Sequence, residues 1–140
     1  MSDVSPPART EKGKPASTHR PVSPHLQVYR PQLTSVLSIF HRFTGMILSA
    51  ALFIFALWLV ILSLGPDVYL MSFAWLTSPV GIGILFIISL AAFYHLCTGI
   101  RHLIWDMGWA LSLEAVYTSG WLALIAAGVL TAGYWLWILS

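Results

Sequence analysis

Charged side chains are scarce in this sequence of 140 residues. Lys, Arg, Asp and Glu make up 9% of the residues, against roughly a quarter in typical soluble domains, whereas 58% are hydrophobic and seven are tryptophan. So little charge cannot form the surface of a soluble globule, and it leaves no broad basic surface for nucleic acid. The composition therefore predicts a membrane protein in contact with the lipid bilayer.

Cysteine is almost absent as well. The single cysteine, Cys97, lies within an apolar segment and has no second cysteine in the chain to pair with. This excludes an internal disulfide framework and a metal cluster built from cysteines.

Three segments are nearly free of charge, and each is long enough to cross ~30 Å of hydrocarbon, which takes about 20 residues. We predict transmembrane helices over three approximate ranges: 35–64, 80–104 and 119–140. Thr34 or Ser35 could cap the first of them. Residues 65–79 are expected to form a turn, and the predicted fold of residues 33–140 is an all-α membrane domain.

Residues 1–32 are rich in Pro, Ser, Lys and Arg, and we predict that they form a flexible arm. Of the seven Lys and Arg residues, only Arg101 follows the first apolar run. The positive-inside rule places the arm in the cytoplasm, or in the matrix of a mitochondrion. Because the arm does not resemble an acid-free mitochondrial presequence, we expect a bacterial inner membrane, and a mitochondrial one is less favoured.

The stretch FYHLCTGIRHLIWD, residues 93–106, concentrates polar groups near the end of the second span. At ~3.6 residues per turn, His95, Gly99 and His102 share one helix face. A histidine inside the hydrocarbon is costly unless it is paired or bound. Its neutral imidazole could bind haem iron, Gly99 could leave room for the flat macrocycle, and Arg101 with His102 could meet the propionates.

The same residues have a simpler interpretation. His95 could hydrogen-bond a neighbouring helix, Gly99 could only assist packing, and Arg101 with His102 could anchor the helix end at the interface. From the residues alone, both interpretations stay open.

A second polar cluster lies near the start of the first span. Ser38 and Arg42, at i and i+4, share a helix face beside His41, and they could hold the head group of a quinone. Alternatively, Arg42 extends to lipid phosphates and Ser38 bonds the helix backbone. Gly45 and Ser49 predict close helix packing and no chemistry.

The segment from His95 to Asp106 resembles the signature of the cytochrome b large anchor subunits of succinate dehydrogenase, His-x3-Gly-apolar-Arg-His-apolar-x-Trp/Phe-Asp. A second signature of that family is present as RPVSPHLQVY from Arg20, followed by SIFHRFTG from Ser38. Both occur in the family's order, and the resemblance covers residues 20 to about 140.

The resemblance implies a membrane anchor of complex II that is not catalytic alone and that assembles with a small membrane-anchor subunit, an iron–sulfur subunit and a flavoprotein. It implies haem b shared with the small anchor subunit, with His95 as the axial ligand and with His41, Arg42 and His102 near the propionates. Ser38 and Arg42 would help to form the site of ubiquinone reduction. The alternatives are a haem-free, quinone-reactive anchor and a structural membrane protein with no redox role.

Overall fold

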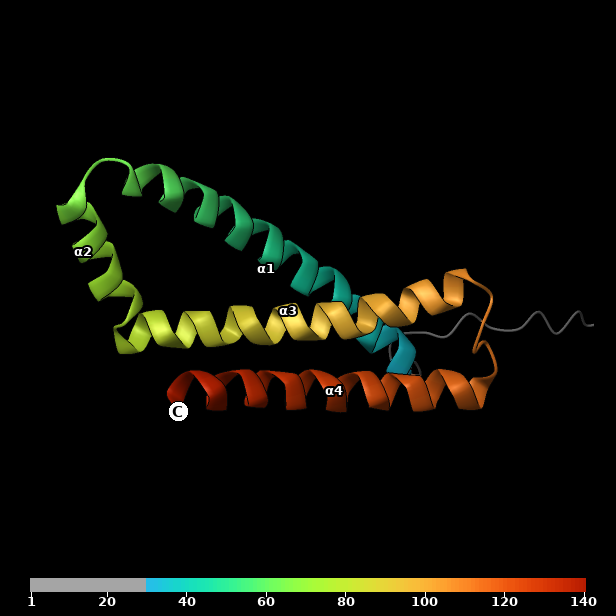
Figure 1. The fold of residues 1–140 in the computed structure, drawn as a ribbon. Coiled ribbons are helices and arrows are strands. Elements are labelled where there is room, and N and C mark those ends of the chain that lie inside the picture. The colour runs from blue at the N-terminus through green and yellow to red at the C-terminus, as the bar shows by residue number, and fades with distance from the viewer. Residues whose placement is uncertain (1–29) are drawn as a thin grey trace, which may run out of the picture. The chain divides into compact units, whose positions relative to one another are not determined.

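The computed structural model describes residues 30–140, and all its regular structure is helical (Figure 1). The helices follow one another as α1 (Leu33–Leu62), α2 (Pro66–Leu76), α3 (Pro79–Asp106) and α4 (Leu113–Leu139). Residues 1–29 of the predicted arm lie outside the described residues.

Among the described helices, α1, α3 and α4 are long and apolar enough to cross a membrane. They contain 30, 28 and 27 residues, and at ~1.5 Å per residue each exceeds the ~30 Å of a hydrocarbon core. Large apolar side chains are exposed along all three, as lipid-facing helices require. The all-α fold with three membrane-spanning helices is confirmed.

The helix starts differ from the expected ones. Helix α1 begins at Leu33 with Gln32 at the N-cap and without a side-chain cap bond, so the predicted cap by Thr34 or Ser35 is wrong. Helix α4 begins at Leu113 instead of residue 119, because the Ser112 hydroxyl accepts a hydrogen bond from the Ala115 N–H.

Residues 65–79, expected to be a turn, contain the short helix α2. Pro66 occupies its first turn with Asp67, and both residue types are typical of helix starts. Gly65 has a φ of 136°, which lets the chain change direction between α1 and α2. The prediction of a turn alone for this segment is wrong, although Pro66 and Asp67 were a helix-start signal in the sequence.

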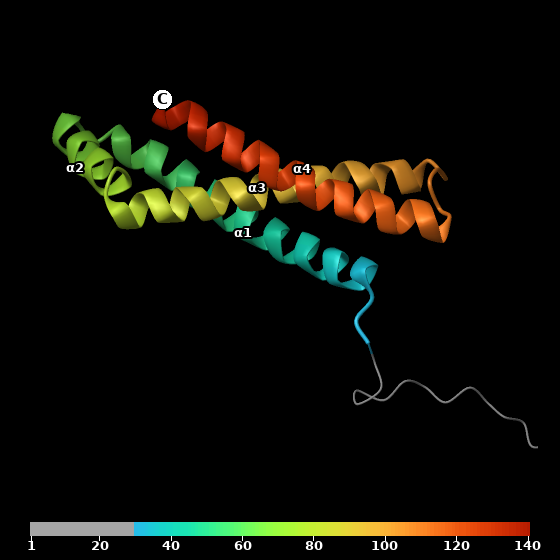
Figure 2. The same cartoon turned by 90° about the horizontal axis from the view of Figure 1, so that it is seen from below.

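Helices α3 and α4 run antiparallel and side by side, and α1 is inclined against them (Figures 1 and 2). The buried residues of α4 are small and recur every three or four positions: Gly120, Ala123, Ala127 and Thr131. A Cβ at Gly120 would lie 3.0 Å from a Leu37 methyl of α1 and 3.6 Å from the Arg101 guanidinium of α3. The start of α1, the end of α3 and the start of α4 therefore meet at one end of the bundle.

Gly81 allows the corner between α2 and α3 to close. A Cβ there would overlap the carbonyl oxygen of Trp75 and lie 2.6 Å from that of Leu76. Because these are backbone atoms, Gly81→Ala should lower the free energy of unfolding by about 1–3 kcal/mol. Gly83→Ala is the matched control, since nothing lies within 4 Å of its Cβ. Denaturation of both variants in detergent measures the difference, and equal stability would contradict this close approach.

Candidate functional site

Polar groups join α1 to α3 at the crossing of these two apolar helices. The Tyr94 hydroxyl donates to the Leu37 carbonyl oxygen at 2.9 Å. The His41 Nδ1 and the Thr98 hydroxyl lie 2.7 Å apart, and the His95 Nδ1 lies 3.1 Å from the His41 carbonyl oxygen. Because lipid hydrocarbon offers no alternative partner, these bonds fix the side chains of the crossing.

The hydrogen bonds of His95 define which ring nitrogen carries hydrogen. The His41 carbonyl oxygen can only accept, so the His95 Nδ1 is the donor. The Thr44 hydroxyl lies 3.2 Å from the same nitrogen and directs its own hydrogen to the carbonyl oxygens of Phe40 and His41, each at 2.9 Å. In the neutral ring, the Nε2 of His95 therefore keeps its lone pair and is available as a ligand.

Three imidazoles form a histidine cluster, which comprises His41, His95 and His102. The rings of His41 and His95 stack with centroids 3.9 Å apart and planes 9° from parallel. The His102 ring lies 5.0 Å from that of His41, at an interplanar angle of 59°. The predicted face of α3 that carries His95 and His102 therefore contacts His41 of α1. The structure brings these three predicted residues together.

A groove of about 430 Å³ lies along the cluster. Its lining combines the three imidazoles with one glycine and apolar side chains: His41, His95, His102, Gly99, Leu96, Ile100 and Leu103. Gly99 faces His41, since a Cβ there would lie 3.7 Å from the Cε1 of that ring. The backbone at Gly99 thus leaves space beside the histidines.

Gly45 has a closer relation to the site than the sequence indicated. A Cβ at this position would lie 3.1 Å from the Cε1 of His95, nearer than side chains normally approach. Gly45 was assigned to helix packing alone, whereas the structure places it against the candidate ligand. The signal available in the sequence was its place at the end of the SIFHRFTG motif.

Ser38 and Arg42 lie on the flank of this crossing. Leu37 and His41 belong to the face of α1 that contacts α3. Ser38 and Arg42 each come one residue later in the chain, so they lie ~100° further around the helix. Ser38 is half-buried and Arg42 is exposed. On α1, the hydrogen bonds to α3 in the described residues involve Leu37, His41 and Thr44, and not Ser38 or Arg42. The structure keeps these two residues on the same helical turns as His41 without joining them to the cluster.

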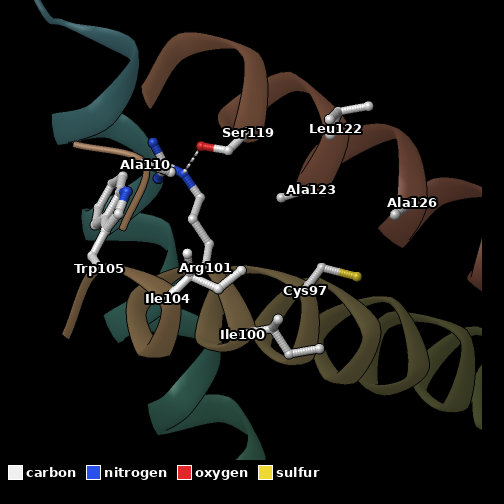
Figure 3. Close-up of a pocket in the computed structure, with 10 residues that line it drawn as sticks. All are labelled: Cys97, Ile100, Arg101, Ile104, Trp105, Ala110, Ser119, Leu122, Ala123 and Ala126. Atoms are coloured by element: carbon white, nitrogen blue, oxygen red, sulfur yellow. Dashed lines mark hydrogen bonds between the residues drawn. The ribbon is translucent and has the colours of Figure 1, made fainter. Parts of the chain in front are cut away.

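The side chain of Arg101 extends toward Ser119 of α4 (Figure 3). It is 4% exposed, its Nε donates to the Ser119 hydroxyl at 3.0 Å, and an Nη donates to the Val116 carbonyl oxygen at 2.8 Å. The guanidinium also lies 3.9 Å over the Trp105 ring. These contacts support a structural role for Arg101, and they do not support the alternative in which it meets haem propionates.

Arg101→Lys should weaken the contact between α3 and α4. A single ammonium group cannot reproduce the two directed bonds and the stacking on Trp105, so we expect a loss of about 1–3 kcal/mol in the free energy of unfolding. Ser119→Ala removes one of these bonds and should cost less. The free energy of unfolding of the isolated variants is measured in detergent. An Arg101→Lys protein as stable as the parent would refute the structural role.

The fold and the site together define a multi-pass helical membrane protein that holds imidazoles between two of its spans. Residues 16–134 match the family of succinate dehydrogenase/fumarate reductase transmembrane subunits, and the chain belongs to this family. The resemblance drawn from the two sequence signatures is thereby confirmed.

Similar proteins occur in bacteria and in eukaryotes. The succinate dehydrogenase cytochrome b556 subunit of Rickettsia felis is 44% identical over 116 residues, which cover 83% of this chain and 90% of that protein. The cytochrome b560 subunit of Reclinomonas americana is 42% identical over 123 residues, covering 84% and 85%. The mitochondrial cytochrome B subunit of Schizosaccharomyces pombe is 42% identical over 127 residues, covering 83% and 67%.

Proposed function

We propose that this chain is the cytochrome b anchor subunit of a succinate:ubiquinone oxidoreductase, in which it binds haem b through His95 and helps to form the ubiquinone site. The observation that carries the proposal is the bond from the His95 Nδ1 to the His41 carbonyl oxygen beside the groove. Similar proteins are named succinate dehydrogenase cytochrome b subunits, which agrees with a redox role in this complex.

The residues of the groove fit a haem. Histidines that bind a metal usually donate their second ring nitrogen to a carbonyl or carboxylate oxygen, and His95 has this arrangement. Gly45 and Gly99 leave open the space that a side chain at either position would narrow. A bound haem would supply one-electron transfer, while this chain orients the ligand ring through the hydrogen bonds and packing of His95.

We assign the iron ligand of this chain to His95 alone. The His41 ring is stacked face to face on that of His95, an arrangement that does not favour both rings binding one iron. We propose that the small membrane-anchor subunit would supply the other ligand. His102 and the Arg42 guanidinium would instead donate to the haem propionates, and His41 would lie near them.

Ser38 and Arg42 supply the donors for ubiquinone. They lie near the start of α1, close to the predicted membrane boundary, and neither takes part in the bonds between α1 and α3 among the described residues. A hydroxyl and a guanidinium can donate to the carbonyl oxygens of the quinone ring while its tail stays in lipid. The boundary also gives access to the protons that quinone reduction consumes. The iron–sulfur and small anchor subunits would complete this site.

The chain would act only as part of the complex. The flavoprotein would oxidise succinate, and the iron–sulfur subunit would deliver the electrons to the quinone. We propose that the N-terminal arm faces the cytoplasm of a bacterium and that the spans lie in its inner membrane, in keeping with the excess of Lys and Arg before the first span. The same side of a mitochondrial inner membrane is the less favoured alternative.

His95→Tyr should remove the haem signal from the assembled complex, since a phenol does not replace the neutral imidazole ligand of a cytochrome b. The reduced-minus-oxidised absorption spectrum of the purified complex measures this loss. His102→Tyr makes the same replacement at a proposed propionate partner, and it should lower the haem signal less because the iron ligand stays in place. An unchanged spectrum in His95→Tyr would show that His95 only packs, as in a haem-free anchor.

Ser38→Ala and Arg42→Ala should each lower quinone reduction. Loss of one hydrogen bond worth about 1.4 kcal/mol corresponds to a decrease of about tenfold. Succinate oxidation with a soluble artificial acceptor should persist, because that reaction does not use the membrane site. Both rates are measured on the same purified complex, and their equal decline would indicate failed assembly and no quinone role.

A further inference from the structure

Thr98 makes a contact that the proposed function does not use. From its geometry we infer that Thr98 is a positioning residue. Its hydroxyl fixes the tautomer and the ring plane of His41, and the stacked His41 ring in turn fixes the orientation of the His95 ring. The inference rests on the proposed function insofar as His95 binds the haem iron.

The Thr98 hydroxyl can act only as an acceptor toward His41. Its single hydrogen is directed to the Tyr94 carbonyl oxygen at 2.7 Å, with the His95 carbonyl oxygen at 3.3 Å. The oxygen then accepts from the His41 Nδ1 at 2.7 Å. Thr98 is 1% exposed, so neither water nor a lipid head group reaches this bond. The Nδ1 of His41 is consequently the protonated nitrogen, and the ring is tied to α3.

His41 contacts His95 in two independent ways. Its carbonyl oxygen accepts from the His95 Nδ1 at 3.1 Å, and this contact belongs to the α1 backbone. Its ring covers one face of the His95 ring at 3.9 Å, and this contact depends on where the side chain is held. Thr98 controls only the second contact, so its removal should change the freedom of the His95 ring without removing the ligand.

Loss of the Thr98 hydroxyl would leave the His41 Nδ1 without its partner. A buried unpaired donor is unfavourable, so the ring would turn toward another acceptor and uncover one face of His95. The His95 ring could then rotate and lengthen its own bond from Nδ1. Because that bond increases the basicity of a metal-binding imidazole, its weakening favours reduced over oxidised iron.

The test compares variants of Thr98 in the purified complex. Thr98→Val keeps the shape of the side chain and removes the hydroxyl, whereas Thr98→Ser keeps the hydroxyl and removes the methyl. Thr131→Val is the matched control in α4, because Thr131 is 3% exposed and donates to the Ala127 carbonyl oxygen at 2.7 Å but contacts no histidine of the cluster. The readouts are the haem midpoint potential and the low-spin ferric EPR signal, which reports the orientation of the ligand ring.

Thr98→Val should retain the haem and shift the redox equilibrium toward the reduced state by about threefold to tenfold, which is about 28–59 mV for a one-electron couple. Thr98→Ser and Thr131→Val should keep the parent potential and EPR signal. If Thr98→Val does not assemble, Thr98→Ala removes the same hydroxyl with a smaller side chain and should show the same shift.

A parent-like potential in the variants that lack the hydroxyl would overturn the inference, and so would equal shifts in Thr98→Ser and Thr98→Val, which would indicate packing alone. These results differ from failure of the proposed function. Loss of haem in His95→Tyr together with an unshifted Thr98→Val would refute the positioning role and leave the ligand assignment intact. Haem that survives in His95→Tyr would refute the ligand assignment itself.

Discussion

The bond from the His95 Nδ1 to the His41 carbonyl oxygen is the interaction on which the site depends. It lies between two helices that cross the membrane, where a polar side chain must find its partner within protein. The bond joins α1 to α3 and leaves the Nε2 of His95 as the nitrogen with a lone pair. One contact thus stabilises the helix crossing and prepares the ring for a ligand role.

Helix α3 contacts both of its long neighbours from one broad face. Tyr94, His95 and Thr98 carry polar groups that bond α1. Arg101 follows Tyr94 by seven residues, so it lies only ~20° from it around the helix, and it is buried against α4 and stacks on Trp105. The bonds of Arg101 therefore hold α4 next to the contacts with α1, and α3 is fastened to both neighbours near the histidine cluster.

Much of this arrangement could be predicted from the sequence because it follows from the phase of single helices. Apolar length indicated three spans, and the spacing of His95 and His102 placed them on one face. The position of a residue around its helix does not reveal which neighbouring helix it contacts. The stacking of His41 on His95 and the acceptor role of Thr98 could therefore be recognised only in the structure. Arg101 shows the same limit, since its place next to His102 in the sequence suggested a shared role although their side chains point to different neighbours.

The stacking also bears on how the proposed haem would be held. A second histidine of the same chain is close to His95, yet it lies against the face of the ring and is held there by Thr98. Under the proposed function, this proximity restrains the ligand imidazole, and the small anchor subunit would supply the other ligand. The groove is bordered by α1 and α3 alone among the described helices, and its apolar lining of Leu96, Ile100 and Leu103 suits a flat, largely apolar macrocycle. The same stacked pair would thus orient one ligand within this chain and leave completion of the site to another chain.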